Sequence, residues 1–313
     1  MRLLLGAGAI GETVKQIQRA LTRSGFDTHG CDGWYGPATA KCVEAFQEQK
    51  NCPITGAIDE VTWGMLMGCA APSVSERCLQ LTAAFEGHGF GHAVGNFDGA
   101  LLTWGIVGFT LASGGIQSIV RAVNSSKPEL LEGTFGDKCC ELLELISAPR
   151  DAQTQWANQH THRTGALAEP WCSLFATLGS LPEVQREQLR LVEEKYMAPA
   201  IHTAKRLGFS SELGLALCFD IHVQNGGIKQ TALDQIRQKL AAKLSEPELR
   251  ATVANAVADA ASPLWRDDVR QRKLTIAHGE GTVHGHHYVL MNWGLSGEFD
   301  APEMVAPIAL GAD

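Results

Sequence analysis

The stretch L-Q-L-T-A-A-F-E-G-H-G-F-G-H-A-V-G-N-F-D-G-A-L-L-T, Leu79 to Thr103, decides the fold of the larger part of this chain. Leu79 and Glu86 are seven residues apart, so they share one face of a helix predicted over 76–85. Two glycines end that helix, and a glycine-rich, aromatic segment over 95–109 follows without helical period. The stretch therefore predicts a helix with a Glu at its last turn, followed by a small sheet or loop.

Glu86 is the strongest candidate for a chemical role. If Leu79 faces the core, Glu86 faces inward at the negative end of the helix dipole, where its anionic form is disfavoured. A carboxyl group that keeps its proton there suits general acid catalysis of glycosidic cleavage. The alternative interpretation is a solvated Glu beside a helix end.

Downstream of this stretch, helical periodicity dominates as far as residue 277. We expect a mainly α fold of α+β type for this part and a small three-helix domain before it. The predicted helices cover 115–123, 137–146, 181–205, 213–224, 231–244, 247–261 and 267–277.

Upstream, three short helices are predicted over 12–24, from Pro37 onward, and over 60–66. They would bury one apolar cluster together. Its members are Val14, Ile17, Leu21, Val43, Phe46, Trp63 and Leu66. Trp34 and Tyr35, in the loop between the first two helices, either contact a sugar face or stem peptide or simply pack that loop.

This segment resembles the common peptidoglycan-binding domain of bacterial and phage wall hydrolases. The resemblance rests on V-K-Q-I-Q-R-A-L at 14–21, C-D-G-W-Y-G-P-A-T at 31–39, V-E-A-F-Q at 43–47 and I-T-G-A-I-D-E-V-T-W at 54–63. These motifs occur in the family's order and fill nearly the whole segment. The resemblance implies a three-helix bundle that binds bacterial peptidoglycan.

The run from Leu79 to Phe109 resembles the active-site region of bacterial chitosanases, which belong to the lysozyme superfamily. Later blocks at 213–226 and 265–279 resemble the family's buried helix and its Arg-rich helix. The resemblance implies a lysozyme-like fold for the catalytic part. It also implies that Glu86 is the general acid, that Asp98 is the base or an electrostatic stabiliser, and that Thr103 holds the attacking water. It also suggests inversion of configuration.

Two features depart from the chitosanase pattern. Ala100 stands where the family has an Arg, and the interval from Glu86 to Asp98 is shorter than in a chitosanase. Both argue against specificity for glucosamine polymers and leave glycosidase chemistry intact. We expect His88 and Trp104, together with Trp34 and Tyr35, to bind the substrate.

Asp220 lies in the middle of an apolar helix and needs a cationic or hydrogen-bonding partner if it is buried. Arg266, Arg270 or Arg272 would supply that partner and hold Glu86 in the same network. This predicts a structural role for Asp220.

A rival chemistry would use zinc, because His278, His284, His286 and His287 lie close together in the sequence. The complete zinc-peptidase motifs are absent, so we expect no metal and no cofactor.

The odd number of cysteines and the lack of a C-x-x-C pair favour small buried thiols in a reducing compartment. A Cys31–Cys42 or Cys52–Cys69 bridge is the alternative.

The net charge of -8 disfavours nucleic acid and anionic membranes as partners. The N-terminus lacks the long apolar run of a secretory signal, which predicts a protein that is made in the cytoplasm and acts on the wall after release. We also expect the protein to be a monomer. We assign 1–69 to wall binding, 70–76 to a linker, 77–295 to catalysis and 296–313 to a tail.

These features together predict a peptidoglycan hydrolase of endolysin type, muramidase-like in its chemistry. The alternatives are a zinc-dependent wall amidase or endopeptidase, and a non-catalytic wall-binding protein on the same scaffold.

Overall fold

The computed structural model describes residues 2–87, 89–96, 99–239 and 244–302. Backbone contacts divide the chain into two compact units. Unit 1 comprises Met1–Phe85 and Met197–Asp313, and unit 2 comprises Glu86–Tyr196. Among the described residues, the helices are all too short or too polar to cross a membrane. The mainly α fold expected from the sequence is confirmed.

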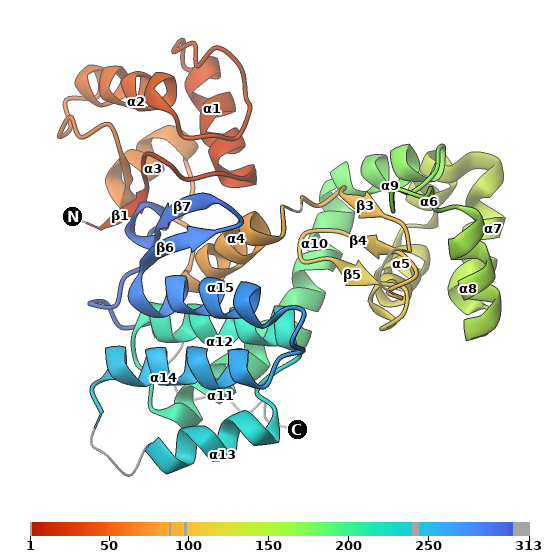
Figure 1. Cartoon of the computed structure of the whole chain (residues 1–313). Helices are drawn as coiled ribbons and strands as arrows, with labels where there is room; N and C mark the ends of the chain where they lie inside the picture. Colours follow the sequence, from red (N-terminus) through yellow and green to blue (C-terminus); the bar gives the residue numbers. More distant parts are fainter. Residues whose placement is uncertain (1, 88, 97–98, 240–243, 303–313) are drawn as a thin grey trace, which may run out of the picture. The chain divides into compact units, whose positions relative to one another are not determined.

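Unit 1 begins with the three predicted helices, α1 (Glu12–Arg23), α2 (Pro37–Gln49) and α3 (Glu60–Met67) (Figure 1). The short strands β1 (Leu3–Leu5) and β2 (Ile58–Asp59) pair antiparallel beside them, which the sequence patterns did not predict. Asp59 also caps α3 by accepting a hydrogen bond from the Thr62 amide at 2.7 Å. The predicted apolar cluster is confirmed except for Leu66, which is only half-buried.

Helix α4 (Val74–Glu86) follows, and it starts with the capping box that Ser73 and Glu76 form. The Ser73 amide donates to the Glu76 carboxylate at 2.7 Å, and the Glu76 amide donates to the Ser73 hydroxyl at 3.2 Å. The helix extends slightly beyond the predicted range at both ends.

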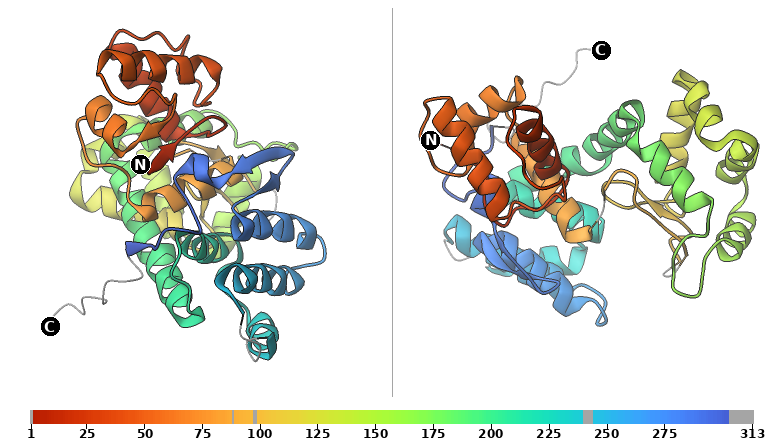
Figure 2. Two further views of the ribbon diagram at one scale, coloured as in Figure 1. Left: turned by 90° about the vertical axis from the view of Figure 1, so that its left-hand side faces the viewer. Right: turned by 90° about the horizontal axis from the view of Figure 1, so that it is seen from above.

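The rest of unit 1 is a group of helices that follow one another in the chain. Helix α15 packs on α14 and on α12, while α11 packs on α12 and α13 on α14, as Figure 1 and Figure 2 show. All described residues of α12 up to Ile221 are buried, which makes it the central helix of this group. The bounds are α11 (Ala198–Leu207), α12 (Glu212–Asn225), α13 (Gln230–Lys239), α14 (Glu246–Asp259) and α15 (Arg266–His278).

A β-hairpin of β6 (Glu280–Val283) and β7 (His286–Val289) follows α15 and leads into the short helix η3 (Leu290–Trp293). Its two turn residues, His284 and Gly285, have φ of 50° and 81°. Positive φ at both positions is the requirement of a type I′ turn, which matches the twist of a hairpin. The sequence patterns did not predict this hairpin.

Unit 2 contains the small antiparallel sheet predicted after Glu86, with strand order β3-β4-β5 (Figure 1). Its strands are β3 (Ala93–Val94), β4 (Thr103–Trp104) and β5 (Phe109–Thr110). Its helices are α5 (Gly115–Ser126), α6 (Pro128–Phe135), α7 (Cys139–Ser147), α8 (Arg150–Gln159), α9 (Trp171–Ser180) and α10 (Pro182–Val192), with the short turn η1 (Gly136–Lys138) before α7.

The long helix predicted over 181–205 is present but interrupted. A π-helical segment, η2 (Glu193–Met197), separates α10 from α11. Pro199 has no amide hydrogen to donate to the carbonyl of Lys195, one turn earlier, so regular α-helical bonding cannot continue through this point. The change from one unit to the other falls between Tyr196 and Met197, within this segment.

The expectation that the cysteines are mostly buried is wrong. All nine lie within the described residues, and only Cys78, Cys139 and Cys218 are buried. Cys31, Cys69 and Cys140 are exposed.

Candidate active site

Glu86 is the last residue of α4, and its side chain is half-buried. Gly87 follows with φ of 65°, a left-handed conformation that ends the helix directly after the carboxylate. The predicted position of Glu86 at the end of a helix is thus confirmed, and its side chain is partly exposed. Its role as general acid stays a prediction.

The helix that carries Glu86 is held by a buried ionic network one turn earlier. The Thr82 hydroxyl donates to Asp220 Oδ1 at 3.0 Å, and the Asp220 side chain is fully buried. Arg272 donates from Nη2 to Oδ1 at 2.6 Å and from Nε to Oδ2 at 2.9 Å. The ammonium group of Lys273 also donates to the Asp220 carboxylate. The structural role predicted for Asp220 is therefore supported, with Arg272 as the partner.

The network keeps Asp220 ionised. Burial raises the pKa of this carboxyl, but the charges and hydrogen bonds of Arg272 and Lys273 outweigh burial, so its pKa lies well below the ordinary value. Lys273, which the sequence patterns missed, is fully buried and also donates to Gln224 Oε1 at 2.6 Å. Arg270, another predicted candidate, instead contacts Asn255 and Asp259.

Thr103 opens β4 and is half-buried. It pairs in register with Val94 of β3 and Thr110 of β5, so it lies in the central strand of the small sheet. A backbone fixed on both sides gives the Thr103 hydroxyl a defined position, which suits a residue that holds a water molecule.

Gln188 of α10 holds the loop after Glu86 to the turn after β4. Its side-chain oxygen accepts from the Ile106 amide at 3.0 Å, and its side-chain nitrogen donates to the Phe90 carbonyl at 2.9 Å. Gln188 is fully buried, and Gly105 beside it has φ of 92° and no room for a Cβ, which would lie 2.5 Å from the Gln188 oxygen. The sequence patterns did not single out Gln188.

Trp104 does not line a binding surface, and the expectation that it contacts substrate is wrong. Its side chain is fully buried, donates from Nε1 to the Phe175 carbonyl at 3.0 Å and packs against the Phe175 ring at 5.4 Å between centroids. In a central strand, alternate side chains face opposite sides of the sheet, so Thr103 and Trp104 have different surroundings.

Asp98 and His88 lie outside the described residues, so their predicted roles stay predictions. Among the described residues on either side, the side-chain oxygen of Asn96 accepts from the Gly99 amide at 3.1 Å and the Leu101 amide at 3.2 Å. Leu101 has a φ of 70°.

Two of the four histidines that suggested zinc, His284 and His287, lie beside a carboxylate. His284 Nε2 lies 2.7 Å from Asp268 Oδ1, and His287 Nε2 lies 3.2 Å from Glu280 Oε1. Over the described ranges, no three His, Cys, Asp or Glu side chains converge in a group that would hold a metal ion.

Trp34 and Tyr35, in the loop between α1 and α2, differ in exposure to solvent. The Trp34 side chain is 53% exposed, while its backbone is held by Gln18 and Asp32, so the indole ring is presented to solvent in a fixed loop. Tyr35 is fully buried and donates its hydroxyl to the Gly56 carbonyl at 3.0 Å. Direct contact between Tyr35 and a ligand is therefore excluded in this conformation, and that expectation is corrected.

Comparison with solved structures supports the fold. A mutant chitosanase from Bacillus subtilis MY002 complexed with 6 GlcN is 16% identical, with a TM-score of 0.51, over 69% of this chain and 98% of that one. A GH46 chitosanase from Gynuella sunshinyii in complex with chitotetraose is 17% identical, with a TM-score of 0.48, over 66% of this chain and 87% of that one. A search of the curated proteins finds no match.

Two family models match separate parts of the sequence. The peptidoglycan binding domain matches residues 10–66, which include all three N-terminal helices and Trp34. The model for glycosyl hydrolase family 46 matches residues 88–256, more than half of the chain, and begins just after Glu86. The protein is a glycoside hydrolase that carries an N-terminal peptidoglycan binding domain, and it belongs to glycosyl hydrolase family 46.

Proposed function

We propose that this glycoside hydrolase cleaves the glycan strands of bacterial peptidoglycan, as a muramidase-like enzyme of endolysin type. The observation that carries the proposal is the union, in one chain, of a peptidoglycan binding domain with a glycosidase. Binding to the wall raises the local concentration of its glycan around the catalytic part of the same chain. The exposed indole of Trp34 supports the proposal, because an aromatic face offers a stacking surface for a sugar ring.

In the proposed reaction, Glu86 acts as the general acid. It donates its proton to the glycosidic oxygen as the bond from that oxygen to the anomeric carbon breaks. Asp98 accepts a proton from a water molecule that the Thr103 hydroxyl positions, and the water oxygen forms the new bond to the anomeric carbon. Attack from the face opposite the leaving group inverts the configuration.

The buried network contributes by position rather than by proton transfer. Asp220 is held as an anion by Arg272 and Lys273, so it is a poor proton donor near neutral pH. Its hydrogen bond with Thr82 fixes α4 one turn before Glu86. Gln188 likewise fixes the segments before and after Thr103, through its hydrogen bonds with Phe90 and Ile106. Both are positioning residues in this proposal.

Chitosan is the competing substrate, because structurally similar proteins are chitosanases. Ala100 argues against it, since the Arg of the chitosanase pattern is missing at that position. The two substrates also differ in charge: chitosan is a polycation, whereas peptidoglycan carries carboxylates on its peptides.

The test measures new reducing ends released from purified sacculi and from soluble chitosan by the full chain, with and without EDTA. We expect release from sacculi that is insensitive to EDTA and at least about tenfold faster than release from chitosan at equal sugar concentration. Faster cleavage of chitosan would replace the proposed substrate. Release of peptides without reducing ends, lost in EDTA and restored by zinc, would replace the proposed chemistry by that of a wall amidase or endopeptidase.

A further inference from the structure

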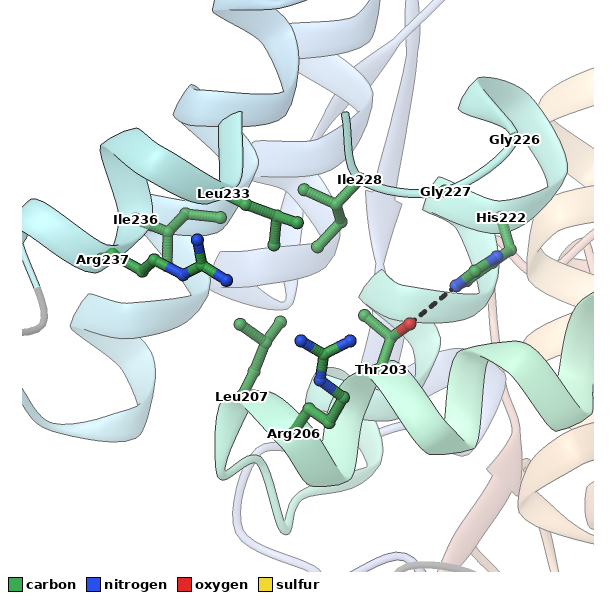
Figure 3. Close-up of a pocket in the computed structure, with 10 residues that line it drawn as sticks. All are labelled: Thr203, Arg206, Leu207, His222, Gly226, Gly227, Ile228, Leu233, Ile236 and Arg237. Atoms are coloured by element: carbon green, nitrogen blue, oxygen red, sulfur yellow. Dashed lines mark hydrogen bonds between the residues drawn. The ribbon is translucent and has the colours of Figure 1, made fainter. Parts of the chain in front are cut away.

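A pocket of about 330 Å³ lies in unit 1 where the end of α11, the end of α12 and α13 meet (Figure 3). Its volume falls in the range of sites that hold small ligands. All of its lining residues come from residues 203–237, so one unit forms it completely. None of these residues belongs to the proposed catalytic set.

One side of the pocket is apolar. Leu207 from α11, Leu233 and Ile236 from α13 and Ile228 from the connecting loop line it. Ile236 is buried, and the other three are half-buried. This wall offers a surface for a methyl-sized or slightly larger apolar group, whose removal from water would favour binding.

Two arginines supply the charge of the pocket. Figure 3 shows the guanidinium groups of Arg206 and Arg237 turned toward the space between α11 and α13. Arg237 has one ion pair, 3.3 Å to Asp234 on its own helix, and both side chains of that pair are more than half exposed. Arg206 has no carboxylate partner within the described ranges. Two like charges thus face one space with most of their hydrogen-bond donors available.

A third part of the wall, formed by Thr203 and His222, is polar. His222 Nε2 lies 2.9 Å from the Thr203 hydroxyl, and partial burial lowers the pKa of His222. The neutral imidazole and the hydroxyl are suited to the amide groups of a ligand rather than to a second charge.

We infer that this pocket binds the carboxylate terminus of a short alanine-containing peptide, the chemistry of the stem peptides of peptidoglycan. Planar guanidinium groups match a carboxylate through paired hydrogen bonds, and the apolar wall accommodates the alanine methyl groups. The identification of the bound peptide as a stem peptide of peptidoglycan rests on the proposed function. The pocket would give the catalytic part of the chain its own contact with the wall, separate from the N-terminal domain.

The test uses the full chain and N-acetyl-D-alanyl-D-alanine, with binding followed by amide chemical shifts of residues 203–237 at low salt. The methyl ester of the same dipeptide tests the need for the carboxylate, and inorganic phosphate tests an oxoanion without an apolar group. The matched variants are Arg206→Gln combined with Arg237→Gln, and Arg163→Gln, an exposed arginine elsewhere in the chain. Melting temperatures check that each variant is folded.

We expect the dipeptide acid to bind the wild-type chain saturably. The methyl ester should bind the wild type at least about tenfold more weakly, and the acid should bind the double variant at least about tenfold more weakly. A tenfold change is the scale of a lost charge-assisted hydrogen bond. Arg163→Gln should bind like the wild type. Absence of saturable binding, equal binding of acid and ester, an equal loss in Arg163→Gln, or tighter binding of phosphate than of the dipeptide would each overturn the assignment. Because the dipeptide has no glycosidic bond, these results do not depend on the proposed catalytic function.

Discussion

Asp220 holds α4, the helix that carries Glu86, through its hydrogen bond with Thr82. Its carboxylate is fully buried and balances two buried cations, Arg272 and Lys273. Removing one partner of such a group leaves uncompensated charge inside the protein, which costs far more than the pair contributes as a whole.

We therefore expect Asp220→Asn to lower the free energy of unfolding by about 3–5 kcal/mol. The matched control is Asp234→Asn, which breaks an exposed ion pair with Arg237 and should change stability by less than about 1 kcal/mol. Urea denaturation of both variants measures the difference. Equal, small effects would mean that the buried network does not support the fold as described.

The same residue gives a pH prediction. Because the folded pKa of Asp220 lies below the ordinary value of about 3.9, the unfolded state takes up a proton first as the pH falls. The stability that Asp220 provides is thus fully present above about pH 5 and is lost as the pH falls from about 4 toward the folded pKa. The gap in unfolding free energy between wild type and Asp220→Asn should be constant from pH 5 to 8 and shrink below pH 4. A gap that stays constant down to pH 2.5 would contradict this assignment.

At this scale, sequence reasoning found Asp220 and three arginine candidates, of which Arg272 is the partner. It missed Lys273 because adjacent residues on a helix point in different directions. A pattern that turns Arg272 toward Asp220 therefore turns Lys273 away from it. The long side chain of Lys273 reaches the same carboxylate nevertheless. It also took Tyr35 and Trp104 for ligand contacts, because residue type alone does not reveal which aromatic rings are buried.

Among the elements, the small sheet of unit 2 depends on α10 through Gln188. Gln188→Met keeps the size of the side chain and leaves the Ile106 amide and the Phe90 carbonyl without this partner. We expect a loss of about 2–4 kcal/mol in unfolding free energy, since each unsatisfied buried group costs about 1–2 kcal/mol. Turnover should fall as well, because the segments on both sides of Thr103 lose an anchor.

The control for this prediction is Gln155→Met, an exposed position on α8 of the same unit. It should leave both stability and turnover close to the wild type. If Gln188→Met is as stable and as active as Gln155→Met, the hydrogen bonds of Gln188 do not position the sheet.

Periodicity predicted α4 and α15, because each has apolar residues that repeat at helical spacing on a buried face, whereas α12 was predicted from its nearly continuous apolar sequence and is buried on all sides as far as Ile221. It missed α6, α8 and α9, which are short and whose apolar residues pack within a local aromatic cluster around Trp171. The hairpin of β6 and β7 was also missed, because its V-H-G-H turn and histidine-rich strands resemble a polar loop.

For the molecule as a whole, the N-terminal helices are joined to the rest of unit 1 by more than the chain itself. The Gly6 amide donates to the Asn292 carbonyl at 2.9 Å, and the Asn292 side chain donates to the Ala7 carbonyl at 2.8 Å. The domain limits at 69 and 77 that we assign from sequence therefore stay proposals about function rather than about independent folding.

We expect the fragment of residues 73–313 to melt at a temperature lower than the full chain by roughly 4–8 °C, the scale of two lost hydrogen bonds in a unit of this size. It should retain activity on soluble glycan fragments and lose more on intact walls. Trp34→Ala in the full chain is the matched control: it should weaken binding to sacculi and leave the melting temperature unchanged. A fragment that melts like the full chain would show that the N-terminal helices are only a tether.

The central claim is that Glu86 is the general acid of a peptidoglycan glycosidase. The most direct measurement is the rate of new reducing ends from sacculi for Glu86→Gln, with Glu129→Gln, an exposed glutamate of unit 2, as the control. The amide keeps the size of the side chain but has no proton to transfer, so turnover should fall by roughly 10²–10⁴-fold with circular dichroism and melting temperature unchanged, while Glu129→Gln stays fully active. A folded Glu86→Gln variant that keeps more than about a tenth of wild-type turnover would contradict the assignment of this site.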